Sequence, residues 1–301
     1  FVCVPLVYEG ESLGVLFADN IRSKRPFSQS DISLLTGVAT QIAISIRTAM
    51  SYQKLQESKE REQSLRKLFE KYVPAPVIKR YLHSRGVDLF QGEESTITVL
   101  FLDLRGFTSS SENMEAGDVV SFLNSYFEEC ASVVLEGKGH INKYTGDGFL
   151  AIFGAPEPLK GHVRRAFDTA CRLQEITRSF LLAGNPIAVG IGLHTGKAIL
   201  GNIGSRTKME YTAIGDTVNT AARLQEYTRQ LHDCPIIMSG PVREGLVSDP
   251  RYADVRSLGR LEIRGKKTEM EAFGFSLFPG ADPGADDQSG GLMPLQRIRG
   301  V

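Results

Sequence analysis

The sequence is short of cysteine, has no excess of either charge and contains no long apolar run. Its four cysteines, among 301 residues, show no CxxC spacing, which argues against a zinc knuckle or a disulfide framework and favours a reducing compartment. The 35 lysines and arginines balance the 35 aspartates and glutamates, so bulk charge favours neither nucleic acid nor an anionic membrane as a partner. No apolar run approaches the roughly 20 residues that span a bilayer, and no signal-peptide pattern opens the chain. We therefore expect a cytoplasmic segment without direct membrane contact.

The N-terminal 50 residues combine a predicted hairpin with a predicted helix. Two short apolar runs flank the turn signal Glu9-Gly10-Glu11. Apolar residues at helical spacing follow, with Ser30 or Asp31 as the expected N-cap. Phe27 and Asp31 give an F-x3-D pattern that resembles the end of a GAF domain, so residues 1–50 are expected to be the C-terminal part of a GAF-like sensor.

The motifs of cyclic-nucleotide-binding GAF domains are only half present, as Asn20-Ile21 and Asp31-Ile32. A structural hairpin and helix without a ligand is therefore the favoured interpretation. Residues 51–92 read as a linker helix and connector, and Pro74 and Pro76 are expected to stop the helix. A weak parallel coiled coil and a solvated connecting helix remain equally favoured, because the heptad seam is broken by polar residues.

The pattern over residues 93–279 predicts an α+β sandwich in which helices return onto a mixed sheet. The glycine-, proline- and aspartate-rich segment 280–301 is expected to be a disordered tail. The predicted elements are a buried strand at 97–104, a helix around 119–127, a hairpin turning at 146–148, a helix over 162–182, a strand pair within 187–203, a helix over 216–231, a strand at 234–240, a further helix and a terminal strand pair.

Asp103 and Asp147 are the candidate chemical groups of this domain. Asp103 interrupts an apolar strand, ITVLFLDL, and Asp147 lies on the predicted Gly-Asp-Gly turn. Adjacent strands of one sheet would bring the two carboxylates together, where they repel unless a cation lies between them, and hard divalent cations prefer oxygen ligands. Taken singly, each aspartate fits a structural role better.

Four segments found in one order change that balance: FLDLRGFT (101–108), NKYTGDGFLAIFG (142–154), GLHTGKAILGNIG (192–204) and YTAIGDTVNTAARL (211–224). Together they resemble the class III nucleotidyl cyclase domain over residues 93–278. The resemblance implies a ferredoxin-like, palm-type fold that works as a head-to-tail homodimer. It also implies two Mg²⁺ or Mn²⁺ ions bound by Asp103, Asp147 and the backbone carbonyl of Leu104.

Further roles are implied position by position. Lys143 would recognise the purine together with Thr212, where many adenylyl cyclases have aspartate, a departure typical of the bicarbonate-responsive subclass. In the NTAAR segment, Asn219 would orient the ribose and Arg223 would stabilise the pentavalent phosphorus. The basic residues expected to hold the β- and γ-phosphates are Arg206, Lys208 and Lys266.

Elementary chemistry agrees with these roles. Asn219 and Arg223 are four residues apart, so one helix presents amide and guanidinium on the same face, and the planar guanidinium matches phosphate oxygens. A lysine donating to adenine N1 and a threonine hydroxyl accepting from the N6 amino group would select ATP over GTP.

The sequence therefore predicts an adenylate cyclase that forms cyclic AMP from ATP as a homodimer, with possible bicarbonate regulation. Two alternatives stay open: a guanylate cyclase with the same mechanism, and a catalytically silent regulatory module. The silent module is disfavoured because both aspartates and the arginine are present. A diguanylate cyclase is disfavoured because no GGDEF-like turn occurs in the sequence.

Overall fold

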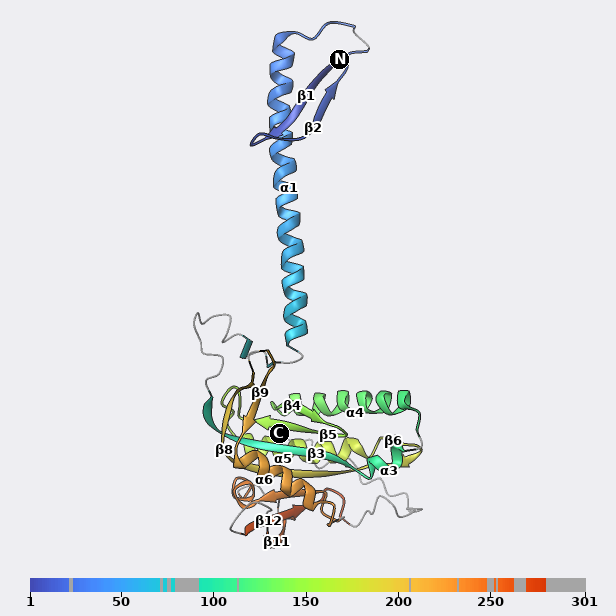
Figure 1. The fold of residues 1–301 in the computed structure, drawn as a ribbon, viewed down its shortest axis with the longest axis vertical. Coiled ribbons are helices and arrows are strands. Elements are labelled where there is room, and N and C mark those ends of the chain that lie inside the picture. The colour runs from blue at the N-terminus through green and yellow to red at the C-terminus, as the bar shows by residue number, and fades with distance from the viewer. Residues whose placement is uncertain are drawn as a thin grey trace. The chain divides into compact units, whose positions relative to one another are not determined.

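The computed structural model describes residues 1–21, 24–70, 73–74, 77–78, 92–112, 114–205, 207–231, 233–247, 252, 254–262 and 269–279. The chain divides into two compact units, Phe1–Tyr72 and Val73–Val301, each with its own hydrophobic core (Figure 1). The segment 280–301, expected to be a disordered tail, lies outside the described residues.

The first unit is a hairpin packed on a long helix. Strands β1 (Val2–Tyr8) and β2 (Glu11–Ala18) pair antiparallel, and Glu9 and Gly10 form the turn with positive φ angles of 49° and 85°. This confirms the predicted hairpin. Helix α1 (Gln29–Phe69) follows as one continuous helix of 41 residues. The predicted stop near the prolines agrees with a helix that ends at Phe69; Pro76 is outside the described residues.

The N-cap of α1 is Ser28, so the prediction of Ser30 or Asp31 was wrong by two or three residues. The Ser28 hydroxyl accepts from the backbone N–H of Asp31 at 3.2 Å, and the Asp31 carboxylate accepts from the Ser28 N–H at 2.8 Å. This reciprocal arrangement is a capping box. Asp31 therefore serves the helix from its third position, and these hydrogen bonds lower the pKa of its carboxyl.

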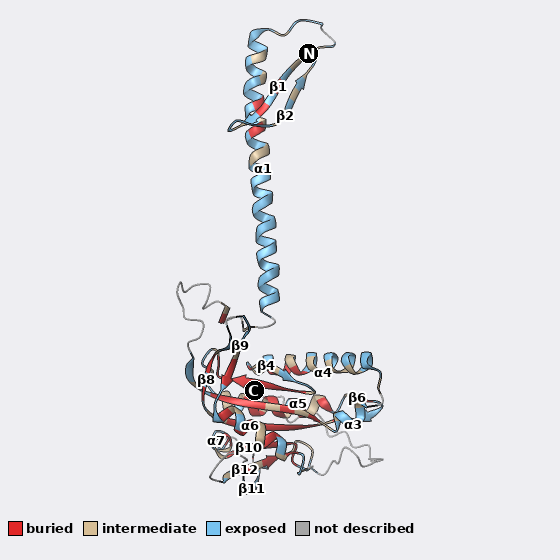
Figure 2. Ribbon diagram, in the orientation of Figure 1, coloured by how far each residue is buried: buried red, intermediate tan, exposed pale blue. Residues whose placement is uncertain are grey.

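Only a short part of α1 is covered by the hairpin. Ala39 and Ala43 are buried against Val4 and Leu6, whereas the charged half beyond Met50 is exposed along its length (Figure 2). By length and composition, α1 is also the one helix among the described residues that contains a stretch apolar enough to cross a membrane. The core helix of a soluble protein passes the same test of length and composition.

The second unit is built on a mixed sheet with strand order β11-β12-β10-β8-β3-β5-β4, to which β9 adds by pairing with the end of β8. All neighbours are antiparallel except β10 and β8. A separate small hairpin is formed by β6 (Leu181–Leu182) and β7 (Asn185–Pro186). The strands of the main sheet are β3 (Glu93–Arg105), β4 (His140–Thr145), β5 (Gly148–Phe153), β8 (Ala188–Gly204), β9 (Met209–Ile214), β10 (Ile236–Ser239), β11 (Arg256–Leu261) and β12 (Met270–Phe275).

Helices cover both faces of this sheet. The chain order β3-α4-β4-β5-α5-β8 combined with the spatial order β8-β3-β5-β4 is a ferredoxin-like unit, which confirms the predicted fold class. Helices α4 (Ala116–Glu136) and α5 (His162–Thr177) cover one face through Tyr126, Phe167 and their neighbours. Helix α6 (Asp216–Tyr227) packs on the other face, and the short helices α3 (Phe107–Ser111) and α7 (Gly240–Glu244) lie at connections.

Two predicted elements of this unit were wrong. The segment 187–203, predicted as a strand pair, forms a single long strand, β8, and Gly192 within it lies against α6. A Cβ at Gly192 would meet the Ala221 carbonyl oxygen at 2.2 Å and the Gln225 nitrogen at 2.3 Å. The helix predicted over 162–182 ends at Thr177, since Leu181 and Leu182 belong to the β6–β7 hairpin.

Candidate active site

Asp103 and Asp147 lie close together where strand β3 ends and β4 turns into β5. Asp103 is near the end of β3 and opposite Gly148 in the register with β5, and Asp147 occupies the turn that joins β4 to β5. A Cβ at Gly148 would meet the Leu102 carbonyl oxygen at 2.2 Å and Asp103 Oδ1 at 3.1 Å. Glycine at this position therefore lets the turn approach Asp103 closely, as the Gly-Asp-Gly pattern predicted.

The two carboxylates influence each other electrostatically. Burial, and after it the negative charge of Asp103, raise the pKa of the Asp147 carboxyl, while Arg229 acts in the opposite direction. Leu102 and Leu104 point into the core under α4 and α5, so alternation along β3 directs Asp103 toward the α6 face. The site is thus a pair of acids at a strand end, where positive charge is favourable.

Helix α6 and the turn after it supply that positive charge. Arg229 Nη2 donates to Asp103 Oδ2 at 2.6 Å, and Gln225 Nε2 donates to the same oxygen at 3.4 Å. The close contact of α6 with Gly192 brings this segment within reach of β3. Neither residue was predicted from the sequence, although their spacing of four repeats the spacing of Asn219 and Arg223.

Asn219 and Arg223 lie on a different side of α6. The helix buries Thr217, Thr220 and Ala221 against the sheet, whereas Asn219 is exposed. The Arg223 guanidinium donates to both carboxylate oxygens of Glu226 at 2.7 Å, and this pairing raises its pKa. Within one chain, Asp103 is therefore paired with Arg229, and Arg223 is presented outward.

Lys143 and Thr212 approach each other from β4 and β9. Lys143 Nζ lies 3.9 Å from Glu210 Oε1, and Glu210 is two residues from Thr212, on the same face of β9. Thr212 is buried and donates from its hydroxyl to Asn142 Oδ1 at 2.7 Å. Asn142 and Glu210 were not predicted, and their contacts depend on the approach of two strands far apart in the sequence.

The basic residues predicted to bind phosphates are only partly described. Lys208 is exposed in the loop between β8 and β9, where its N–H donates to the Ser205 carbonyl at 3.3 Å. Arg206 and Lys266 lie outside the described residues.

The donor set around Asp103 fits a hard divalent cation. Two carboxylates lie close together, and burial and then the charge of Asp103 raise the pKa of Asp147, so a cation between them would be favourable. Oxygen ligands suit Mg²⁺ or Mn²⁺, which keep water or substrate phosphate as further ligands. Among the described residues no group of three or more acidic, histidine or cysteine side chains gathers in one place. Leu104, whose backbone carbonyl the resemblance implies as a further ligand, is buried in β3 next to Asp103.

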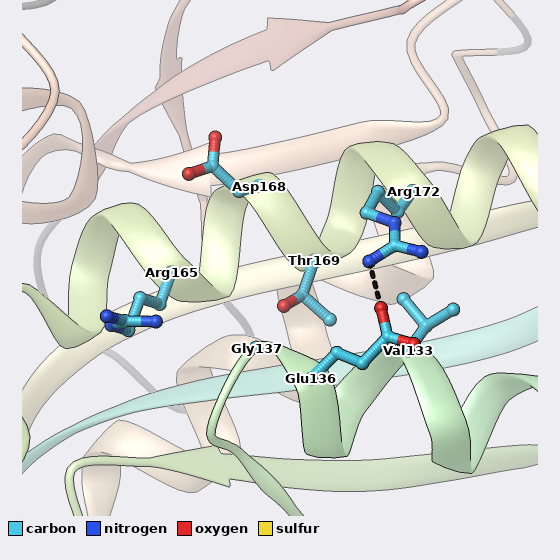
Figure 3. Close-up of a pocket in the computed structure, with 7 residues that line it drawn as sticks. All are labelled: Val133, Glu136, Gly137, Arg165, Asp168, Thr169 and Arg172. Atoms are coloured by element: carbon cyan, nitrogen blue, oxygen red, sulfur yellow. Dashed lines mark hydrogen bonds and ion pairs between the residues drawn. The ribbon is translucent and has the colours of Figure 1, made fainter. Parts of the chain in front are cut away.

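A separate cavity of about 190 Å³ lies between α4 and α5, on the sheet face opposite to Asp103 (Figure 3). Its wall includes Glu136, Arg165, Asp168 and Arg172, and Arg172 forms an ion pair with Glu136. The ion pair between Arg172 of α5 and Glu136 of α4 joins the two helices at this cavity.

Comparison with known proteins assigns the site to a class of enzymes. The adenylate and guanylate cyclase catalytic domain family matches residues 90–276, and the GAF domain family matches residues 1–46. The chain therefore belongs to the adenylate and guanylate cyclase catalytic domain family.

Individual relatives include both nucleotide classes. An adenylate cyclase of Anabaena cylindrica is 32% identical over 68% of this chain, which spans 42% of that relative. The structure of a bacterial light-regulated adenylyl cyclase aligns with 73% of this chain and 63% of its own, at 28% identity and a TM-score of 0.59. A guanylyl cyclase crystal structure aligns with 61% of this chain and 92% of its own, at 31% identity and a TM-score of 0.52.

Proposed function

We propose that this chain is an adenylate cyclase that converts ATP into 3′,5′-cyclic AMP and pyrophosphate. The observation that carries the proposal is the meeting of Asp103 and Asp147 at the β4–β5 turn, beside β3. The adenylate cyclases among the relatives support the nucleotide class. Since the chain covers less than half of those relatives, the activity of the whole protein is part of the proposal.

In the proposed reaction the ribose 3′-oxygen attacks the α-phosphorus. A new phosphorus–oxygen bond forms, the bond from the α-phosphorus to the bridging oxygen of the β-phosphate breaks, and pyrophosphate leaves with that electron pair. The proton of the 3′-hydroxyl passes to solvent, so no side chain has to act as the base. Two Mg²⁺ or Mn²⁺ ions bound by Asp103, Asp147 and the Leu104 carbonyl would lower the pKa of the hydroxyl and neutralise phosphate charge.

The outward face of α6 has the groups that the reacting centre needs from a second subunit. Asn219 would hold the ribose, and Arg223 would stabilise the charge that develops on the α-phosphate oxygens. Arg223 would exchange Glu226 for phosphate, a stronger bidentate partner. Lys208, with Arg206 and Lys266, would hold the β- and γ-phosphates.

A homodimer would bring these groups to the acids. Apolar side chains are exposed on the β8–β9 hairpin, where Ile199 and Ile214 are register partners and Ile203 lies on the same face. Helix α1 adds exposed Leu34, Leu55 and others beyond the hairpin. Exposed apolar groups of this kind favour a protein partner, and a second copy of the chain is the partner that completes the site.

The proposal also includes regulation of the cyclase by the first unit and by bicarbonate. The GAF-like unit and α1 would transmit a signal to the dimer, and the protein is expected in the cytoplasm. A response to bicarbonate rests on Thr212 alone. Adding bicarbonate at fixed pH should raise the rate of cyclic AMP formation, and an unchanged rate would remove bicarbonate from the account.

The proposal is tested by parallel turnover of ATP and GTP with Mg²⁺ and with Mn²⁺. Wild type should form cyclic AMP, and Asp103→Asn or Asp147→Asn should lower the rate by about a thousandfold, because a site that stabilises developing charge loses a ligand. Asp118→Asn, at an exposed carboxylate in the first turn of α4, is the matched control and should retain the rate. Turnover retained by both site variants would refute the assignment.

A guanylate cyclase is the second candidate, because guanylyl cyclases are among the similar structures and Glu210 places a carboxylate beside Lys143. The same assay separates the two, since a guanylate cyclase would use GTP. A silent regulatory module would use neither nucleotide.

A further inference from the structure

We propose that Asn142 is a positioning residue that fixes the Thr212 hydroxyl as a hydrogen-bond acceptor and so makes the base site select adenine. The inference rests on the proposed function, in which Lys143 and Thr212 face the purine. It concerns a side chain that touches Thr212 and has no assigned role of its own.

The backbone places Asn142 for this purpose. In the β4–β5 register Ile141 is opposite Ala151 and Lys143 is opposite Leu150, so Asn142 is the extra residue of a β-bulge. A bulge re-aims a side chain, and that of Asn142 reaches β9, a strand that pairs with β8 and not with β4. Asn142 is thus a polar link between the strand of Lys143 and the strand of Thr212.

The hydrogen bonds of Asn142 can be arranged in only one direction. Its Nδ2 donates to the backbone carbonyl of Tyr211 at 2.7 Å, and a carbonyl oxygen can only accept. The amide is therefore oriented with Oδ1 toward Thr212. Because Oδ1 can only accept, the Thr212 hydroxyl must donate its single proton at that 2.7 Å contact.

Once this proton is committed, Thr212 offers only lone pairs to any other neighbour. Thr212 is 5% exposed, so water is a poor substitute partner at that oxygen. The amino group at N6 of adenine is a donor and satisfies the lone pair, whereas O6 of guanine is an acceptor and would meet it with repulsion. A free threonine hydroxyl can rotate and donate to O6, so the selectivity belongs to the pair and not to Thr212 alone.

Lys143 strengthens the same choice. Its ammonium is a donor in every orientation, which suits N1 of adenine and not the N1–H of guanine in the same pose. Glu210, 3.9 Å from Lys143 Nζ, gives this ammonium a partner on β9. Asn142 and Lys143 of β4 are therefore both tied to β9, and the base site presents one donor, Lys143, and one acceptor, Thr212.

The test measures, for two replacements of Asn142, how strongly the enzyme prefers ATP over GTP. The measured quantity is the ratio of kcat/KM for ATP to kcat/KM for GTP. Asn142→Leu keeps the size but removes the acceptor, so Thr212 can donate to guanine, and the ratio should fall about tenfold, mainly through KM. Asn142→Asp keeps an oxygen that accepts from Thr212 and loses the donation to Tyr211. It should keep the ratio within about threefold of wild type, although the free energy of unfolding falls.

If Asn142 only stabilises the fold, neither replacement should change the ratio. Asn142→Asp, which puts a carboxylate next to the Tyr211 carbonyl, would then lower the free energy of unfolding more than Asn142→Leu. An unchanged ratio in folded Asn142→Leu, or a tenfold fall in Asn142→Asp, overturns the proposal. Asn142→Ala is the second variant without an amide, with the same expectation as leucine.

Binding measurements keep this test separate from the test of catalysis. Displacement of a fluorescent ATP analogue by ATP and by GTP gives a ratio of dissociation constants that should fall about tenfold in Asn142→Leu. If wild type binds ATP selectively but forms no cyclic AMP, the proposed activity fails and the role of Asn142 is still decided by this ratio. A wild type that prefers GTP contradicts the base assignment itself and the role of Asn142 with it.

Discussion

At the scale of single residues, Arg229 forms an ion pair with Asp103, one of the two acids. Its Nη2 atom lies 2.6 Å from Asp103 Oδ2, so it would compete with a cation for this carboxylate. The arginine side chain is 67% exposed and the aspartate side chain 16%, so solvent weakens the pair, which is worth at most about 1 kcal/mol. Arg229 is therefore a weak competitor that must move aside when the site is loaded.

Replacing Arg229 by glutamine should tighten Mn²⁺ binding up to about fivefold. The change removes a positive charge, which repels the cation, from beside the Asp103 carboxylate. Isothermal titration of Mn²⁺ into the nucleotide-free protein measures this directly. Arg243→Gln, in the last turn of α7, is the matched control and should leave the affinity unchanged. Weaker binding in the Arg229 variant would mean that the guanidinium orients Asp103 for the metal instead of competing with it.

A second prediction at this scale concerns acid stability. Burial lowers the pKa of His140 to about 4, and its Nε2 atom is buried without a hydrogen-bond partner among the described residues. The unfolded chain binds a proton near pH 6.5 and the folded chain only near pH 4. The buried neutral His140 therefore costs the folded protein no stability above pH 6.5. As pH falls from 6.5 to 4, the free energy of unfolding decreases by about 3 kcal/mol, because the unfolded chain takes up the proton first.

Urea unfolding of wild type and His140→Gln at pH 7 and at pH 4.5 checks this. The variant should lose less stability than wild type on acidification, since glutamine takes up no proton. Equal losses in the two proteins would show that other groups carry the acid sensitivity.

At the scale of elements, the site depends on how closely α6 lies on β8. Gly192→Ala would force a methyl group into the backbone of Ala221 and Gln225, and we expect at least about 2 kcal/mol of lost stability together with reduced turnover. Gly117→Ala, where nothing lies within 4 Å, should change stability by less than about 1 kcal/mol. Denaturant unfolding of both variants decides the point, and a Gly192 variant as stable as wild type would contradict it.

Sequence patterns predicted the local elements of this fold and missed the contacts between distant segments. Periodicity located the hairpin of the first unit, α4, α6 and the turn carrying Asp147, because these signals are local. The segment 187–203 was predicted as a strand pair and is one strand, since a glycine that permits close packing, such as Gly192, and a glycine that permits a turn look alike in sequence. Arg229 and Asn142 were missed because their roles arise only when α6 meets β3 and β4 reaches β9.

At the scale of the whole molecule, the acids and Arg223 are separated within one chain. The acids are approached by Arg229 and Gln225, while Arg223 faces outward with Glu226. The proposed reaction would therefore need two chains, each contributing its acids to one site and its α6 face to the other.

Removal of residues 1–72 tests how the first unit contributes. The second unit has its own core, so the truncated chain should still fold and form cyclic AMP. Its rate should rise more steeply with protein concentration, because the exposed apolar surface of α1 would no longer support the proposed dimer. Sedimentation at matched concentrations accompanies the assay. An unchanged concentration dependence would show that α1 does not contribute to assembly.

The sharing of sites between chains is tested most directly by mixing two inactive variants. Asp103→Ala and Arg223→Ala should each be inactive as pure proteins. When co-expressed, half of the dimers should be mixed and each mixed dimer should have one intact site of two, so about a quarter of the wild-type activity should return. Co-expression of Asp103→Ala with Asp147→Ala, which damages both sites of every dimer, should restore none. Recovery in the first pair alone is the predicted result, and no recovery in it, or full activity of pure Arg223→Ala, would contradict the shared site.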